Sequence, residues 1–354
     1  MKSTMKRLLT FAICAAVLFA SSAAFPCGAS FGTGVTVDPH QDIIVVWKDN
    51  VETYVFQPIF CGTATDFGLV LPVPGLLSQA PSLTNQQAFT KAAALSEPNK
   101  RQVVQPQGGF ACAGGSSAGA KNAAADTATV VASGQVGFLD FVQLQADTTT
   151  ALTDWLTANG YPYSSAATTV FSYYVQKGWY FVAFRISRQA ELGSATICQA
   201  LGPVVLSFPT AVPVVPSRMA TAGSSSTSTT QWFSWRIFGI THGDAQLGFL
   251  NGNSYDRVLW YSGSVNAEDV PSLTGLAEAG DRLTRLAFSF SSGTSDPDID
   301  LTLATPADYR GTEDVYVYDD SACSVSRNGR LPHSLLLTLS GLALFGVICW
   351  RRWR

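Results

Sequence analysis

The segment from Leu331 to Trp350 constrains the architecture of this chain more than any other feature, because it carries no Asp, Glu, Lys or Arg over 20 residues. A helix of that length spans about 30 Å, the thickness of a bilayer's hydrocarbon layer. The arginines that follow favour the cytoplasmic side. A buried core helix is the alternative, but core helices are rarely so uniformly apolar and then abruptly basic. We therefore expect a transmembrane helix over 331–350 and a cytoplasmic basic end over 351–354, with anchor positions at Ser334, Leu335, Leu336, Leu337, Trp350, Arg351 and Arg352.

Residues 1–24 have the pattern of a secretory signal peptide. Three basic residues precede an apolar run, 8–20, that is too short for a comfortable membrane span, and small residues then lead to Ala24. Cleavage by signal peptidase after Ala24 is expected. A lipoprotein is disfavoured, because Cys27 follows Phe25-Pro26 rather than a small residue. The chain is therefore predicted to be exported to the cell envelope or surface as a single-pass membrane protein, with lipid around its C-terminal helix.

The cysteines fit an oxidising compartment. Of seven, Cys14 lies in the predicted signal peptide and Cys349 in the predicted membrane helix, which leaves five in the body. Five is an odd number, so two disulfides and one unpaired thiol would fit. Spacing alone does not determine the pairing. We expect the local pairings Cys27–Cys61 and Cys112–Cys198, with Cys323 left over; free buried thiols are the alternative.

The order of Cys323, a juxtamembrane spacer over 321–330, an apolar helix and an arginine-rich end is similar to the MYXO-CTERM type of bacterial sorting tail. The resemblance implies that a dedicated sorting protease acts near this cysteine before surface display. Here Ala322 precedes Cys323, and the glycine usual in such tails is missing. This difference from the usual tail concerns cleavage near Cys323 and does not affect the predicted membrane anchor.

The predicted mature body, 25–330, is mildly acidic. It contains 16 of the 22 Lys and Arg residues and all 25 Asp and Glu residues, which gives a net charge of −9. Such a charge argues against nucleic acid and against an anionic membrane surface as partners. A body of 306 residues is long enough for one large domain or two smaller ones.

Short runs rich in β-branched and aromatic residues recur along the body and predict an α+β fold, predominantly antiparallel β-sheet with a few packed helices. A hairpin is expected around Lys48–Asn50. The run 179–186 would be apolar on both faces of a strand, which predicts a central strand. Helices are expected over 85–95 and around Trp155 and Phe171. The main domain is placed at 25–220 and a Ser/Thr-rich loop or linker at 221–230. Residues 231–320 either continue the domain or form a small second one.

Four stretches together resemble the bacterial family catalogued as domain of unknown function 2330. They are "VVWKDNVETYVFQPIFCGTATDFGLVLPVPG", "VGFLDFVQLQADTTTALTDWLTANGY", "YYVQKGWYFVAFRI" and "LGPVVLSFPTAVPVVPSRM". The resemblance covers about Cys27 to Ile240 and is specific in combination, whereas 241–320 matches less clearly. It implies an exported, often membrane-anchored protein and no established activity.

Candidate metal ligands occur at two places. Asp296, Asp298 and Asp300 alternate in "SDPDID", a spacing similar to that of calcium loops. The calcium loop's glycine is absent and no Glu follows, so a solvated turn is the favoured interpretation and Ca²⁺ the alternative. In "VDPHQD", His40 and Asp42 also alternate with Asp38, but Pro39 favours a hydrated turn.

Two further patterns are weighed against simpler explanations. "GSSAG" places Ser117 in a G-x-S-x-G motif, but it lacks the preceding apolar strand that a hydrolase needs, and chance matches are easy in a Gly/Ser/Ala loop. Trp232, Trp235, Trp260 and Tyr261 are candidates for an aromatic platform that binds sugars or peptides. On a strand Trp232 and Trp235 point to opposite faces, so large aromatics here are expected in the core.

The sequence therefore favours a non-enzymatic, surface-anchored module with a structural, adhesion or recognition role and no catalytic residue assigned. The alternatives are an extracellular hydrolase and a calcium-stabilised binding module. A pocket holding two close carboxylates would favour the hydrolase. The surface ligand is not specified by the sequence.

Overall fold

The computed structural model describes residues 29–31, 36–37, 40–62, 68–105, 128–161, 163, 167–186, 197–222, 232–242, 245–250, 256–291 and 299–318. The predicted signal peptide, membrane helix and cytoplasmic end lie outside these ranges. Within the described ranges, no helix is both long and apolar enough to cross a membrane. The chain divides into two compact units, one of Met1–Asn99 with Cys112–Glu313 and the other of Lys100–Ala111 with Asp314–Arg354.

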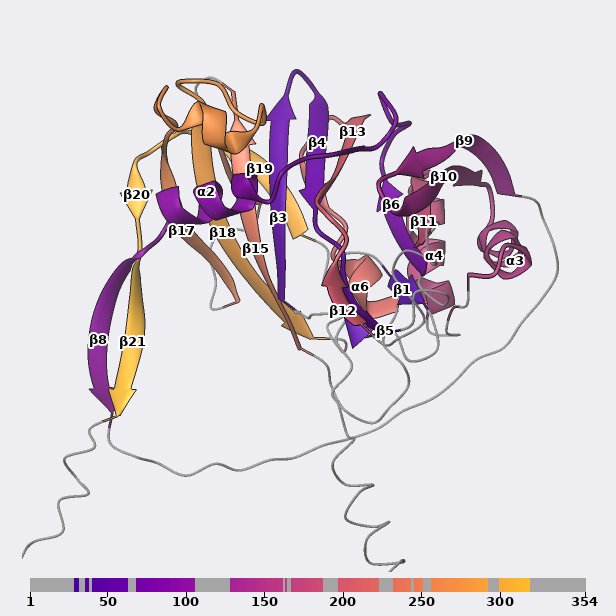
Figure 1. Cartoon of the computed structure of the whole chain (residues 1–354), viewed down its shortest axis with the longest axis horizontal. Helices are drawn as coiled ribbons and strands as arrows, with labels where there is room; N and C mark the ends of the chain where they lie inside the picture. The colour runs from indigo at the N-terminus through magenta and orange to yellow at the C-terminus, as the bar shows by residue number, and fades with distance from the viewer. Residues whose placement is uncertain are drawn as a thin grey trace, which may run out of the picture. The chain divides into compact units, whose positions relative to one another are not determined.

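The largest element of the first unit is an eight-stranded sheet with strand order β20-β17-β18-β15-β3-β4-β13-β7 (Figure 1). Its strands are β3 (His40–Lys48), β4 (Val51–Phe56), β7 (Ser82–Leu83), β13 (Val204–Pro209), β15 (Trp232–Thr241), β17 (Arg257–Ser264), β18 (Arg282–Ser291) and β20 (Tyr309–Arg310). The ladders between neighbours are antiparallel except for that of β15 with β3, which is parallel. Strands from the predicted region 231–320 therefore lie in one sheet with N-terminal strands.

The hairpin predicted at Lys48–Asn50 is observed. Lys48 pairs with Val51, so Asp49 and Asn50 form a two-residue loop, and both have positive φ, +54° and +59°. This conformation suits a type I′ turn, whose twist matches that of the strands it joins. The strand predicted to follow is divided at Pro58 into β4 and β5 (Ile59–Gly62), because proline has no N–H to donate to a ladder.

A second, five-stranded sheet is antiparallel throughout, with strand order β1-β6-β11-β10-β9. It contains β1 (Ala29–Phe31), β6 (Gly68–Val73), β9 (Ala128–Val136), β10 (Leu139–Ala146) and β11 (Tyr180–Ile186). β11 has neighbours on both sides, which confirms the central strand predicted from its apolar character on both faces. β1 pairs only with Gly68–Val70, so Pro72 lies beyond the end of that ladder, where its missing N–H is tolerated.

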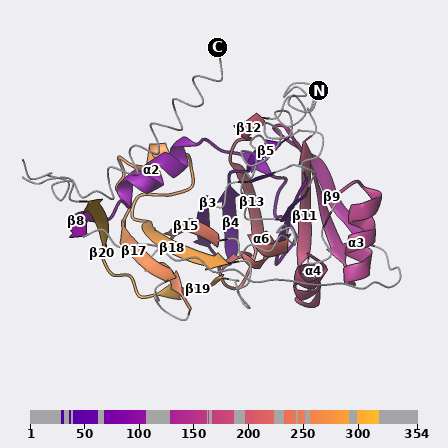
Figure 2. The same cartoon turned by 90° about the horizontal axis from the view of Figure 1, so that it is seen from below.

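Helices α3 (Thr149–Ala158), α4 (Ala167–Gln176) and α6 (Arg218–Ala222) pack with one face of the five-stranded sheet (Figure 2). The Thr148 hydroxyl caps α3 by accepting from the backbone N–H of Ala151 at 3.1 Å. Gly160, with φ of +75°, follows α3 in the left-handed conformation that commonly ends a helix. The apolar side chains of these helices belong to one buried cluster with side chains of β6, β10 and β11.

The opposite face of the five-stranded sheet contributes to a core shared with the eight-stranded sheet. Phe56 of β4 and Phe184 of β11 meet edge to face, with ring centroids 6.0 Å apart. The other face of the larger sheet packs against α2 (Gln87–Leu95) and the 3₁₀ helix η2 (Val270–Leu273). Two layers of sheet with helices outside them confirm the antiparallel-rich α+β class.

Smaller pairings complete the described structure. β12 (Ile197–Ala200), β5 and β2 (Thr36–Val37) form one three-stranded sheet, and β14 (Val214–Val215), β19 (Ile299–Ala304) and β16 (Gln246–Phe249) form another. In the second unit, β8 (Asn99–Gln105) pairs with β21 (Thr312–Tyr318). Arg101 binds Asp314 there through two hydrogen bonds of 2.7 and 2.8 Å.

Candidate functional site

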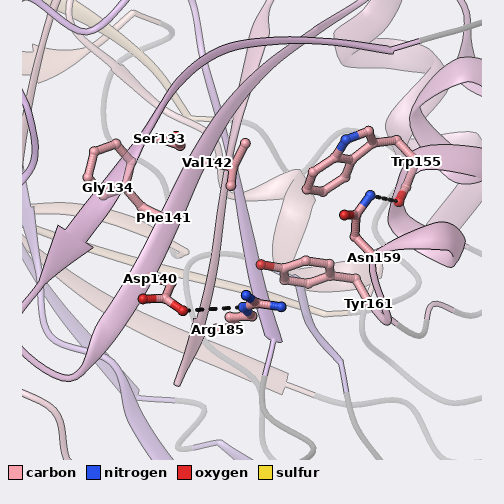
Figure 3. A pocket seen from close by; sticks show the side chains of 9 residues that line it. All are labelled: Ser133, Gly134, Asp140, Phe141, Val142, Trp155, Asn159, Tyr161 and Arg185. Atoms are coloured by element: carbon pink, nitrogen blue, oxygen red, sulfur yellow. Dashed lines mark hydrogen bonds and ion pairs between the residues drawn. The ribbon is translucent and has the colours of Figure 1, made fainter. Parts of the chain in front are cut away.

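A pocket of about 330 Å³, which we call the α3 pocket, opens where α3 meets the five-stranded sheet (Figure 3). Its lining combines one ion pair, three aromatic rings and smaller polar and apolar groups. The residues that line it are Ser133, Gly134, Asp140, Phe141, Val142, Trp155, Asn159, Tyr161 and Arg185. The volume is at the lower end of the range for small-molecule sites.

Strand alternation explains why charged groups gather here. Leu144 of β10 and Phe181 and Ala183 of β11 belong to the apolar cluster beneath the helices. Asp140 and Arg185 lie on the same face, farther along these strands and directly opposite each other in the ladder. The helix-side face of the sheet is therefore apolar under α3 and α4 and becomes polar beyond them, at the pocket.

The ion pair is held in place from a third strand. Arg185 Nε donates to Asp140 Oδ2 at 3.4 Å, and Gln135 of β9 donates through Nε2 to Asp140 Oδ1 at 3.3 Å. The arginine side chain is 59% exposed and the aspartate side chain 34% exposed. Exposed pairs of this kind contribute little to stability. Because the two charges of this ion pair cancel, the pocket presents a hydrogen-bond donor and a hydrogen-bond acceptor without a net charge.

Two stacked aromatic rings form the other wall. The rings of Trp155 and Tyr161 lie 5.8 Å apart between centroids with an interplanar angle of 27°. Tyr161 is buried, whereas Trp155 is half-buried. Gly68 of β6 makes room for the tyrosine, because a Cβ at that position would lie 2.8 Å from Tyr161 Cδ1. The tyrosine ring is thereby fixed between the helix and the sheet.

The polar atoms near these rings keep fixed roles. Burial raises the pKa of Tyr161 to about 12; the positive charge of Arg185 opposes this rise and the negative charge of Asp140 adds to it. The phenol therefore stays protonated at neutral pH. Asn159 donates through Nδ2 to the carbonyl oxygen of Trp155 at 2.8 Å, which leaves its side-chain carbonyl oxygen facing the pocket (Figure 3).

The chemistry that this lining supports is binding. Among the residues that line the α3 pocket, Asp140 is the one carboxylate, and its two oxygens accept from Arg185 and Gln135. The pair of close carboxylates that would favour a hydrolase is therefore not found in this pocket. A second pocket of about 300 Å³, between Thr53, Ser207 and Thr274, is lined by uncharged side chains.

The candidates expected from the sequence fall elsewhere. Asp296, Asp298, Ser117, Cys27, Cys112, Cys323 and the anchor positions from Ser334 to Arg352 lie outside the described residues. Asp300 lies in β19, opposite Val214. No group of three metal-ligating side chains occurs among the described residues. Because Asp296 and Asp298 lie outside those residues, the solvated turn and its calcium-binding alternative both stay predictions.

The turn expected at His40–Asp42 is wrong, because these residues begin β3. Their parallel ladder with β15 outweighs the local effect of Pro39. Asp42 accepts from Arg236 of β15 through two hydrogen bonds of 2.7 and 2.6 Å. This carboxylate is therefore part of an ion pair between neighbouring strands.

The aromatic residues of β15 divide as their spacing predicts. Trp235 is 0% exposed and lies in the core between the sheets, whereas Trp232 is 65% exposed. They do not form one platform. The aromatic wall that the structure does contain is Trp155 with Tyr161, and the helix predicted around Trp155 gave no indication of it.

Comparison with known proteins identifies the family of this chain. The profile of a bacterial protein family, described as uncharacterized protein conserved in bacteria (DUF2330), matches residues 20–302. No curated protein matches this sequence. Among solved structures, the chain is similar to baculovirus P35, with a TM-score of 0.36, 8% sequence identity and coverage of 77% of this chain and 97% of that one. A likeness this distant carries no argument about function.

Proposed function

The chain belongs to this bacterial family, and from that premise we propose that it is an exported, membrane-anchored recognition module that binds a ligand without catalysis in the α3 pocket. The observation that carries the proposal is the combination of an aromatic wall with an internally neutralised ion pair. The predicted signal peptide and the uncharged segment 331–350 support export and anchoring. Cys323 is the proposed position for any sorting protease.

The chemistry of the pocket favours a neutral, polyhydroxylated ligand such as a saccharide. A charged ligand would gain little, because Asp140 and Arg185 already neutralise each other. The hydrogen-bonding groups that remain available to a ligand are N–H donors of the Arg185 guanidinium group and oxygen acceptors of Asp140 and Asn159. Such a mixture of donors and acceptors suits hydroxyl groups. An aromatic ring packs well against the apolar face of a sugar ring. Ligands with both features are therefore expected to bind best.

Binding of the full chain to an array of neutral and charged oligosaccharides tests this proposal, with affinities then measured by titration calorimetry. Trp155→Ala is expected to weaken binding by about tenfold or more, which is about 1.4 kcal/mol. Trp232→Ala is the matched control, because it removes an exposed tryptophan from β15 and should leave the affinity unchanged. Equal losses in the two variants, or a preference for charged sugars, would contradict the proposed site. Hydrolysis of the bound sugar would contradict its non-catalytic character.

Anchoring makes a separate prediction. Deletion of 331–354 is expected to release the body from the membrane fraction into the soluble exported fraction, because the deletion removes the uncharged segment. Fractionation of cells followed by immunoblotting measures the outcome. Replacement of 351–354 by neutral residues is the control, and it should leave the protein in the membrane. A truncated protein that stays with the membrane would show that another part of the chain anchors it.

A further inference from the structure

The three-stranded sheet β12-β5-β2 brings two cysteines together that the sequence assigned to different partners. β12 and β5 are antiparallel, and their register places Cys198 directly opposite Cys61. The two residues are 137 positions apart in the chain. Both pairings expected from the sequence, Cys27–Cys61 and Cys112–Cys198, use one of these cysteines, so neither is compatible with a bond between them.

The hydrogen-bond pattern of this ladder identifies the kind of site that the two cysteines occupy. The backbone N–H of Leu201 donates to the carbonyl oxygen of Pro58 at 3.0 Å, which makes Leu201 and Pro58 a hydrogen-bonded pair. Hydrogen-bonded and non-hydrogen-bonded pairs alternate along an antiparallel ladder. Three positions further along the same register, Cys198 and Cys61 therefore form a non-hydrogen-bonded pair.

That position suits a cross-strand disulfide. Opposed Cα atoms at non-hydrogen-bonded positions lie about 4.5 Å apart, with their side chains on the same face of the sheet. The Cα separation of disulfide-bonded cysteines is about 4.4–6.8 Å. We propose that Cys61 and Cys198 form a disulfide that links β5 to β12.

The reaction needs an oxidant of a defined class. Two thiols lose two protons and two electrons as the sulfur–sulfur bond forms, and a small-molecule or protein disulfide accepts them and becomes two thiols. In the cell this step depends on the proposed export, because oxidising compartments maintain such partners. The geometry of the pair does not depend on export. The bond would close a loop of the chain from Cys61 to Cys198, and every residue that lines the α3 pocket belongs to this loop.

Peptide mapping of the full chain tests the proposal directly, because trypsin places the four candidate cysteines, Cys27, Cys61, Cys112 and Cys198, on separate peptides. These are bounded by cleavage after Arg7 and Lys48 for Cys27, Lys48 and Lys91 for Cys61, Arg101 and Lys121 for Cys112, and Arg188 and Arg218 for Cys198. A non-reduced digest is expected to contain one linked species joining the peptide of Cys61 to that of Cys198. Linkage of Cys61 to Cys27, or of Cys198 to Cys112, would overturn the proposal.

Two sources of protein separate this proposal from the proposed export. Chain purified in reduced form is oxidised with glutathione disulfide, and chain recovered from its native compartment is digested directly. The Cys61–Cys198 species in the first sample supports the pairing, and its absence there refutes it. If the first sample contains this species and the second contains only free thiols, the pairing stands and export to an oxidising compartment fails.

Stability supplies a readout that does not rest on mapping. Cys61→Ala and Cys198→Ala are each expected to lower the midpoint of thermal unfolding of oxidised protein by about 5–10 °C, because the bond closes a long loop in the unfolded chain. The double variant should be no less stable than either single variant. Cys27→Ala with Cys112→Ala is the matched control and should retain the linked species. Losses in the two single variants that add in the double variant would contradict a shared bond.

Discussion

Replacement of Trp235 by alanine is expected to lower the free energy of unfolding by about 3–5 kcal/mol, because it removes a fully buried aromatic side chain from the core between the two sheets. The ring meets Phe290 of β18 edge to face, with centroids 5.1 Å apart, so aromatic packing is lost together with buried area. Neighbouring strands on both sides limit the collapse of the cavity. Urea denaturation followed by far-ultraviolet circular dichroism measures the change.

The same strand offers the control. Trp232→Ala removes a side chain that is 65% exposed and should change stability by no more than about 0.5 kcal/mol. Trp235→Phe should cost less than Trp235→Ala, because it keeps a ring and removes an indole N–H that has no hydrogen-bond acceptor among the described residues. If the two tryptophan-to-alanine variants lose similar stability, the inward orientation of Trp235 is refuted.

The second large effect concerns Glu52, a fully buried carboxyl group on β4. Its Oε2 accepts from the backbone N–H of Val214 at 2.8 Å, and its Oε1 has no hydrogen-bond partner within the described residues. Burial raises the pKa of this carboxyl well above its usual value, and the bond from Val214 opposes the rise only in part. The folded protein therefore holds a proton that the unfolded chain releases at lower pH.

The sign of the pH dependence follows from this proton. Above the pKa of about 4.5 in the unfolded chain and below the raised pKa in the folded protein, the folded state binds one more proton than the unfolded state. Its stability therefore falls by about 1.4 kcal/mol for each unit that the pH rises through this window, and levels off above the folded pKa. Denaturation midpoints measured at successive pH values above about 4.5 are expected to fall until the pH passes the raised pKa of the folded protein.

Glu52→Gln removes the titrating proton while keeping an oxygen for Val214. The variant is expected to show a flatter profile over the same window and to be more stable than the wild-type protein at its alkaline end. Glu278→Gln is the control: Glu278 is exposed, and its hydrogen bond with Lys48 lowers its pKa, so any effect should be small and of opposite sign. Parallel profiles for wild type and Glu52→Gln would contradict a raised pKa at Glu52.

Turns, helix ends and single strands could be predicted where a few neighbouring residues determine the structure. The Asp49-Asn50 turn supplies two residues that tolerate positive φ, and the run that became β11 is apolar on both faces as a central strand requires. The glycine after α3 marked the end of that helix. The strand order was not predictable, because the partner of each strand is decided by side-chain packing across long sequence separations.

The charged residues of the α3 pocket can be identified as neighbours only once the pairing of their strands is known. Asp140 is the single charged residue of β10 and Arg185 that of β11, and the two are 45 positions apart. Each alone is compatible with a strand end exposed to solvent. Their opposition in register, with Tyr161 packed over Gly68 beside them, appears only when β6, β10 and β11 are assembled. The same limitation applied to Cys61 and Cys198.

The parallel ladder of β15 with β3 has a consequence for biogenesis. Arg236 and Asp42, neighbours across this ladder, are separated by 194 positions, so β3 keeps an open edge until most of the chain has emerged from the ribosome or the translocon. Unpaired edges in incomplete sheets promote aggregation of nascent chains. Until β15 is available to pair with it, this edge of β3 therefore stays open to contacts with other chains.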